Sequence, residues 1–168
     1  SCTTVIGNVT DGPHAWNLAK LDGSYYYIDT TWGNSQYFSR QSDQKTTTVS
    51  KYVDYNYFGA TTADIMQSHT PDSRIALPEC TDTADNYYVH ENRYITEWNP
   101  DVIGDIFCQA YEQKEDMVQL KFASVDLYEQ AMQYFVEEYG IASYCPGLSQ
   151  FHYMEDIEGC VLFIAFDD

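Results

Sequence analysis

Two β-rich segments joined by Asp22-Gly23 constrain the fold of this chain more than any other feature. His14-Ala15-Trp16-Asn17 belongs to the first segment, and Tyr25-Tyr26-Tyr27-Ile28-Asp29 begins the second. An Asp-Gly pair readily adopts the positive φ angles of a two-residue hairpin turn. The pattern therefore predicts a β-hairpin whose second strand runs on through Thr31-Trp32-Gly33.

This hairpin brings a histidine and a carboxylate onto one face. With the turn at Asp22-Gly23, His14 lies opposite Thr31 and Trp16 opposite Asp29, and all four side chains project from the same side. His14 and Asp29 are then diagonal neighbours, with Cβ atoms about 7 Å apart. A carboxylate that orients an imidazole is half of a nucleophile–base–orienter triad. The alternatives are a structural strand histidine and an aspartate that caps a turn.

Charge and hydropathy exclude several classes of function. The 168 residues fit one domain, or one domain with a small appendage, and a hydrophobic fraction of 44% is enough for a core. No apolar run approaches the roughly 20 residues of a membrane span. Eight basic against 26 acidic residues give a net charge of −18, which argues against nucleic-acid binding. Residues 1–98 carry 12 acidic and 6 basic residues, and residues 99–168 carry 14 and 2. This shift predicts a domain boundary near residue 99.

Five cysteines form no CxxC pair, which disfavours both a zinc site and a complete disulfide framework. Cys145 and Cys160 flank a predicted hairpin and are candidates for pairing, whereas Cys108 lies on the apolar side of a predicted helix. His69, His90 and His152 are dispersed and fit no metal-ligand spacing, so we expect surface or loop histidines and no metal.

The two parts differ in their predicted elements. Before residue 99 we expect a short strand at 3–9, the hairpin, a polar surface loop at 34–50, an extended segment at 52–58 and a second hairpin at 87–96. After it, the order is α-β-α-β-β: a helix begins at Asn99-Pro100 and a second helix is capped by Ser124. This order predicts a small two-layer α/β subdomain at 99–168.

His14-Ala15-Trp16-Asn17, the Asp-Gly turn and the run Tyr26 to Gly33 resemble the second half of the transglutaminase-like core, in the bacterial cell-surface branch of these papain-related cysteine enzymes. His14, Asp29 and Trp32 match its motif residue by residue. The match is specific over residues 1–33 and looser to about 98. The resemblance implies an α+β fold: a partial transglutaminase-like antiparallel β-sheet core at 1–98, lacking its N-terminal helices, followed by the α/β subdomain.

The segment that carries the nucleophilic cysteine in that family has no counterpart in this sequence before His14. Its cysteine opens a helix some tens of residues before the histidine, whereas only Cys2 precedes His14 here, on a predicted strand. A strand cysteine lacks the helix N-terminus that lowers a thiol pKa. Two explanations stay open: the nucleophile lies upstream of Ser1, or it is absent and the fold serves binding.

The resemblance implies a cysteine protease or acyltransferase that acts on peptide amides at a bacterial cell surface without a cofactor, with cell-wall peptide as one candidate substrate. His14 would be the general base and Asp29 its orienting partner, and Trp16 and Trp32 are candidates for substrate contact or for packing around the site. This chain alone would be inactive because it lacks the nucleophilic cysteine. The alternative is a non-catalytic cell-wall or protein-binding module.

Overall fold

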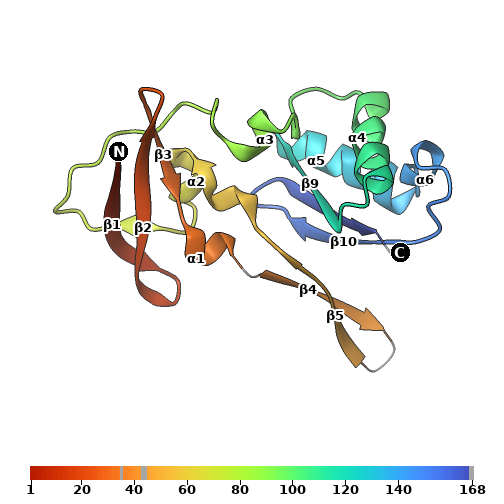
Figure 1. The fold of residues 1–168 in the computed structure, drawn as a ribbon, viewed down its shortest axis with the longest axis horizontal. Coiled ribbons are helices and arrows are strands. Elements are labelled where there is room, and N and C mark those ends of the chain that lie inside the picture. The colour runs from red at the N-terminus through yellow and green to blue at the C-terminus, as the bar shows by residue number, and fades with distance from the viewer. Residues whose placement is uncertain (35, 43–44, 167–168) are drawn as a thin grey trace. The chain divides into compact units, whose positions relative to one another are not determined.

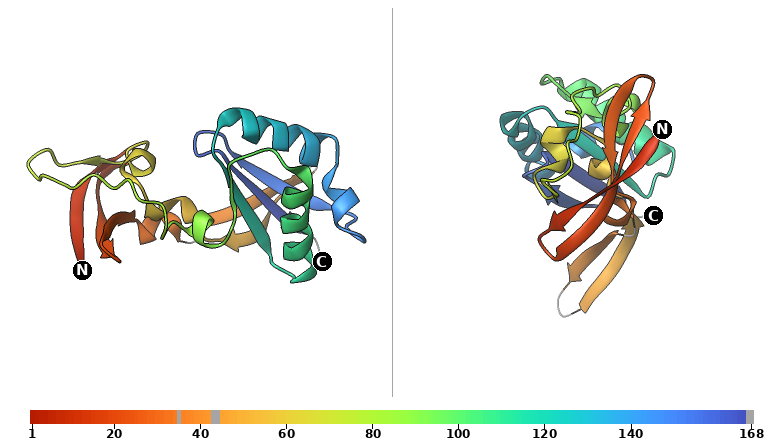
Figure 2. Two further views of the ribbon diagram at one scale, coloured as in Figure 1. Left: turned by 90° about the horizontal axis from the view of Figure 1, so that it is seen from above. Right: turned by 90° about the vertical axis from the view of Figure 1, so that its left-hand side faces the viewer.

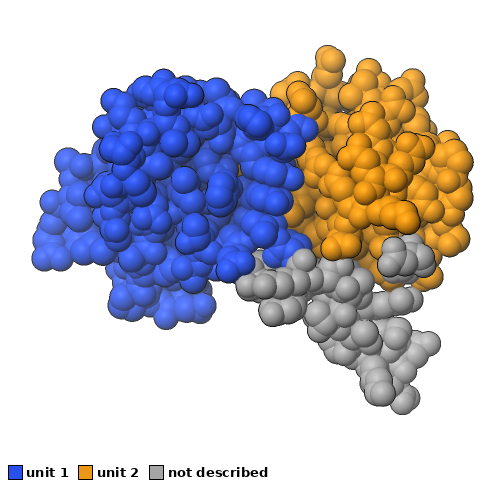
Figure 3. Space-filling view, viewed as in Figure 1, with its two compact units in different colours: residues 1–36, 52–91 blue, residues 37–51, 92–168 orange. Residues whose placement is uncertain are grey.

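The computed structural model describes residues 1–34, 36–42 and 45–166, and for residues 36–42 and 45–51 it describes the backbone alone. Within these ranges the chain is mixed α+β, as the sequence predicts, and divides into two compact units (Figures 1 and 3). The first unit comprises residues 1–36 and 52–91, and the second comprises 37–51 and 92–168. The second unit thus begins seven residues before the expected boundary at 99 and also takes in a segment from earlier in the chain.

A five-stranded sheet in the order β6-β3-β2-β1-β7 forms the first unit. β1, β2 and β3 lie side by side in Figure 1, and every pairing in this sheet is antiparallel. Its elements are β1 (Cys2–Val9), β2 (Gly12–Leu21), β3 (Ser24–Ile28), α1 (Thr30–Gly33), η1 (Tyr55–Tyr57), β6 (Phe58–Ala60), α2 (Thr62–Ile65), β7 (Thr70–Pro71) and α3 (Tyr87–His90).

The sheet of the second unit has the order β10-β11-β9-β8 and carries helices (Figure 2). Its elements are β8 (Tyr94–Ile95), α4 (Pro100–Glu112), β9 (Met117–Phe122), α5 (Val125–Ala131), the π-helix η2 (Met132–Glu137), α6 (Ile141–Tyr144), β10 (Phe151–Asp156) and β11 (Val161–Phe166). The predicted caps are present: Asn99 Oδ1 accepts from the Val102 amide and Ser124 Oγ from the Leu127 amide. The expected α-β-α-β-β order is found, with α6 added.

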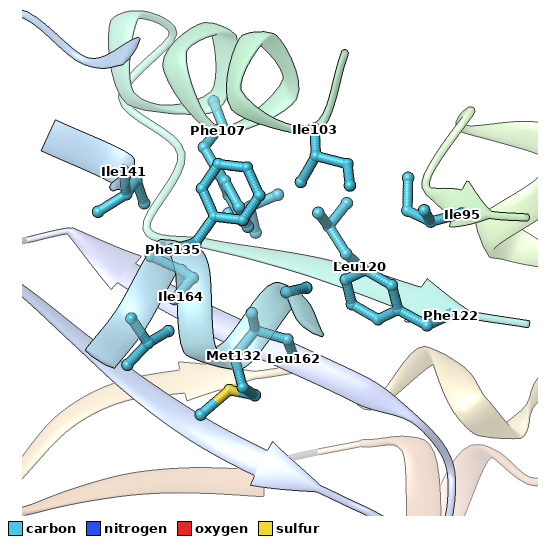
Figure 4. Close-up of a cluster of buried hydrophobic side chains, with 14 of the residues drawn as sticks. Ile95, Ile103, Phe107, Leu120, Phe122, Met132, Phe135, Ile141, Leu162 and Ile164 are labelled. Atoms are coloured by element: carbon cyan, nitrogen blue, oxygen red, sulfur yellow. The ribbon is translucent and has the colours of Figure 1, made fainter. Parts of the chain in front are cut away.

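Apolar faces of these helices pack against alternate residues of β9 and β11, and Figure 4 shows this core. Phe107 of α4, Phe135 of η2 and Leu120 of β9 are all fully buried. The rings of Phe107 and Phe135 meet edge to face at 5.2 Å. Burial of large apolar side chains of this kind stabilises the unit by about 1.5–3 kcal/mol for each.

Three local predictions were wrong. The expected second hairpin at 87–96 is instead α3 followed by β8: Asn86 caps the helix by accepting from the Tyr88 amide, and β8 pairs in parallel with β9. The expected polar loop at 34–50 contains two strands that pair with each other, β4 (Gln36–Ser42) and β5 (Lys45–Tyr52). The expected extended segment at 52–58 contains the 3-10 helix η1, capped by Asp54.

Every cysteine carries a free thiol, so the candidate pair Cys145–Cys160 forms no disulfide in this structure. Cys145 is buried in the second core and Cys160 lies beside it, partly buried. In the part of the chain that the structure describes, no helix is long and apolar enough to cross a membrane.

Candidate active site

The β2–β3 hairpin has the register that the sequence predicts. Asn17 pairs with Ile28 and Leu21 with Ser24, which leaves Asp22 and Gly23 as the two turn residues. Their φ angles are 43° and 100°, the positive values that an Asp-Gly turn supplies. The strand β3 ends at Ile28, however, and does not continue through Trp32 as expected.

Asp29 ends the strand because it caps the short helix α1. Its Oδ1 accepts hydrogen bonds from the amides of Thr31, at 2.8 Å, and Trp32, at 3.0 Å. Its own amide donates to the Tyr57 carbonyl at 2.9 Å, and its carbonyl accepts from the Gly33 amide. These four bonds hold the residue in one orientation, with Oδ2 left to face other groups.

His14 meets that second oxygen. Its Nε2 lies 2.6 Å from Asp29 Oδ2, and its side chain is 15% exposed against 1% for Asp29. Because an ionised carboxylate only accepts hydrogen bonds, Nε2 carries the hydrogen and donates it, which leaves Nδ1 as the free base. Sequence spacing alone predicted this pair.

His69 is the member of this cluster that the sequence did not predict. We expected a surface or loop histidine, yet its side chain is fully buried, and its Nε2 lies 2.9 Å from the same Asp29 Oδ2. Its Nδ1 lies 2.8 Å from the Ser68 hydroxyl, so both ring nitrogens are bonded. The prediction failed because His69 and Asp29 are 40 residues apart and share no local pattern.

Two short elements bring His69 to the site. The helix α2 begins with a capping box between Thr61 and Asp64, and the His69 amide donates to the Ile65 carbonyl at 3.0 Å. The strand β7 starts at the next residue and pairs with β1, Thr70 opposite Asn8. The pairing depends on Gly7, because a Cβ there would overlap the Thr70 carbonyl oxygen and the Pro71 Cα.

The ionised form of Asp29 is strongly favoured. Burial alone would raise its pKa, but hydrogen bonds from His69, from the Trp32 amide, from His14 and from the Thr31 amide outweigh it. The pKa is lowered from 3.8 to about 2. At neutral pH the site therefore contains a carboxylate that accepts from two imidazoles.

Aromatic side chains surround the two imidazoles. The ring of Trp16 lies 4.8 Å from that of His69 and 6.2 Å from that of His14. Trp32 lies 4.9 Å from His69 and contacts Tyr57 edge to face. Trp16 is only 2% exposed, so it acts as packing, whereas Trp32 is partly exposed.

A groove of about 930 Å³ opens beside His14. Its walls come from β1, from the start of β2, from α1 and from the β7 segment, and include Ile6, Gly7, Asn8, Pro13, His14, Ala15, Thr31, Thr70, Pro71, Asp72 and Ser73. The groove gives His14 access to a bound molecule, while Asp29 and His69 stay behind it. This is the arrangement that proton transfer to a bound group requires.

Neither cysteine of the first unit can act as the partner of His14. Cys2 pairs with Ala19 and Gly7 with His14, so Cys2 lies five positions along β1, about 16 Å away, and on the opposite face of the sheet. Cys80 is 2% exposed, and burial raises the pKa of its thiol. A buried thiol of raised pKa is a poor nucleophile.

No model of a known protein family matches the chain, and a comparison with curated proteins finds no match either. The geometry of the His14–Asp29–His69 cluster is therefore the feature of this chain that bears on its function.

Proposed function

We propose that this chain supplies the general base and its orienting carboxylate to a transglutaminase-like site for thiol-dependent acyl transfer or peptide-bond hydrolysis. The observation that carries the proposal is the 2.6 Å bond between His14 Nε2 and Asp29 Oδ2, with His14 at a groove and Asp29 buried. Its resemblance to the transglutaminase-like pattern adds the reaction class. Peptide amides at a bacterial cell surface are the substrates that this class implies.

In this mechanism a cysteine thiol loses its proton to Nδ1 of His14, and the thiolate attacks the amide carbonyl carbon. The C–N bond breaks, His14 returns the proton to the leaving amine, and the acyl group stays on sulfur as a thioester. Water or a second amine then attacks the thioester carbonyl carbon and gives a proton to His14. The C–S bond breaks, the acyl product leaves, and His14 returns the proton to the departing thiolate. Hydrolysis and cross-linking differ only in this last nucleophile.

Asp29 has two roles in this scheme. It fixes the tautomer of His14, because its Oδ2 requires a hydrogen on Nε2, and it stabilises the imidazolium that forms after proton transfer. His69 and the two α1 amides keep the carboxylate oriented. The thiolate must come from a segment other than the first unit as described, since neither Cys2 nor Cys80 is suitably placed.

The test uses the complete product of the gene and a peptide carrying a thiol-directed electrophile, together with a fluorogenic peptide amide. We expect covalent labelling and turnover in the wild type. His14→Gln retains a donor toward Asp29 but no base, and should lower kcat/KM by about 10²–10⁴-fold. His90→Ala is the matched control, because the His90 side chain is 71% exposed, contacts the neighbouring Glu91 and lies outside the His14–Asp29–His69 cluster.

A binding module on the same fold is the second candidate, favoured by the absence of a suitably placed cysteine in the first unit. It predicts peptide binding in the groove that is equal in the wild type and His14→Gln, with no labelling and no turnover. Labelling that is equally fast in His14→Gln would contradict the acyl-transfer proposal.

A further inference from the structure

The His14–Asp29–His69 cluster has a composition that proton transfer does not require. Three potential ligand atoms, His14 Nε2, Asp29 Oδ2 and His69 Nε2, all lie within 4.8 Å of one another. They come from β2, from the N-cap of α1 and from the residue before β7; the local hairpin joins the first two, and the tertiary fold brings the third to them. We propose that this cluster binds a divalent transition metal ion, with Zn²⁺ the best match to its two imidazoles and one carboxylate.

The distances define the change that metal binding requires. Zn–N and Zn–O bonds are about 2.0–2.2 Å long, so tetrahedral ligand atoms lie about 3.3 Å apart. The Nε2–Oδ2 separations are 2.6 Å for His14 and 2.9 Å for His69, which are hydrogen-bond lengths. Each must therefore increase by about half an ångström, and the two histidine ligand atoms, which lie within 4.8 Å of each other, must settle at the same spacing of about 3.3 Å. His14 is the ligand able to move, since it is the partly exposed member of the three.

The surroundings of the cluster match the outer shell of a metal site. A metal-bound imidazole uses its other nitrogen to donate to a neighbouring acceptor, and the Ser68 hydroxyl lies 2.8 Å from His69 Nδ1. The remaining oxygen of Asp29 is held by the amides of Thr31 and Trp32. Both buried ligands are therefore oriented before any ion arrives.

The number of protein ligands and the access from solvent also match a zinc site. Three protein ligands with a fourth position open to water are typical of accessible zinc sites. The groove beside His14 provides that position, and the rings of Trp16 and Trp32 pack against His69. The net charge of −18 raises the local concentration of cations around the whole protein.

Metal and proton then compete for one nitrogen. A metal on Nε2 displaces the hydrogen that His14 donates to Asp29, so the metal-bound protein has no His14–Asp29 dyad. The consequence for catalysis is inhibition by Zn²⁺, and this consequence alone rests on the proposed function. Metal binding itself depends only on the three ligands.

The experiment titrates Zn²⁺ and Co²⁺ into the tag-free chain, with calorimetry for Zn²⁺ and visible absorption for tetrahedral Co²⁺, in excess Mg²⁺ to saturate carboxylate-only sites. We expect one equivalent of each ion and loss of the Nε2-bound hydrogens of His14 and His69 in NMR spectra. His14→Ala should lower the affinity by more than the about 10–100-fold expected for the outer-shell variant Ser68→Ala. His90→Ala should bind as the wild type does.

His14→Ala decides the question, because His14 is partly exposed and the variant should fold even if substitutions of buried His69 do not. Zn²⁺ affinity that is unchanged in His14→Ala, or lowered equally in His90→Ala, overturns the proposal, as does a wild type that binds no Zn²⁺. The activity assay is separate. A chain that binds Zn²⁺ but shows no acyl transfer removes the proposed function and leaves the metal site standing.

Discussion

The two units use their interiors differently. Among the described residues, the buried polar side chains of the first unit are Asp29, His69 and Asn86, whereas that of the second is Gln119. The apolar core of the first unit is also much the smaller (Val5, Trp16, Leu18, Tyr27, Ala60, Ile65 and Cys80 against the 17 buried residues of the other cluster). The first unit therefore encloses a polar cluster and the second a large apolar core.

This difference separates the polar groups of the first unit from the apolar burial that stabilises the second. A buried carboxylate costs free energy unless it is fully hydrogen-bonded, and Asp29 is bonded by two amides and two imidazoles. These bonds keep the buried carboxylate ionised and fixed in one orientation. The second unit, whose buried helix and strand faces are apolar, gains its stability from area removed from water.

The largest loss of stability is expected from a substitution in the apolar core of the second unit. Phe135→Ala removes a ring that is fully buried and that meets Phe107 at 5.2 Å, and should lower the free energy of unfolding of this unit by about 3–5 kcal/mol. Urea unfolding measures the loss. The NMR signals of His14 and His69 should keep their native positions in the folded variant. If the His14 and His69 signals shift as well, the two units do not have independent cores, and this contrast between them is wrong.

The next effect tests how the first unit positions His69. Gly7→Ala places a methyl group against the Thr70 carbonyl oxygen and 2.8 Å from the Pro71 Cα, so β7 must move away from β1. We expect a loss of about 3 kcal/mol and a changed His69 signal by NMR. Thr4→Ala, an exposed position on the same strand, is the control and should change neither.

A smaller change in the free energy of unfolding is expected when the pH is lowered. The pKa of Asp29 is about 2 in the folded protein against its ordinary 3.8, so folding favours the ionised form. This contribution, about 2 kcal/mol, is fully present well above pH 4 and is lost as the pH falls through 3.8 toward 2. Urea unfolding between pH 6 and pH 2, in the wild type and in Asp29→Asn, isolates it. Parallel pH profiles would show that Asp29 is not the residue responsible.

The last prediction needs no substitution and compares how often the two cores open in the unmodified protein. Cys80 reports on the first core and Cys145 on the second, and burial raises the pKa of both thiols, that of Cys145 to about 12. Exposed Cys2 should react with iodoacetamide first. Cys80 and Cys145 should react only through opening, with Cys145 slower because its core is larger. Mass spectrometry of a labelling time course gives the order, and faster labelling of Cys145 than of Cys80 would reverse our ranking of the two cores.

Local sequence signals predicted much of this molecule. The Asp22-Gly23 turn determined the register of β2 and β3, and the register brought His14 to Asp29. Asn99 and Ser124 marked two helix starts correctly. Such signals succeed because a turn or a cap depends on residues within a few positions of one another.

Other signals were misread for a physical reason. A polar stretch without strict alternation was taken for a loop, although β4 and β5 pair there. Tyr87-Tyr88-Val89 resembles a strand by composition, but the Asn86 side chain caps it as a helix. In both cases hydrogen bonds made by backbone groups, to another strand or to a capping side chain, decided the structure, and composition does not specify them.

The sequence by itself determined the dyad, because two strands joined by a tight turn leave a single way to align His14 with Asp29. Only the tertiary structure decided that His69 joins them, since its position depends on β7 reaching β1 past Gly7, far along the chain. Pairings across long sequence separations follow from the packing of the whole unit, and no short motif encodes them.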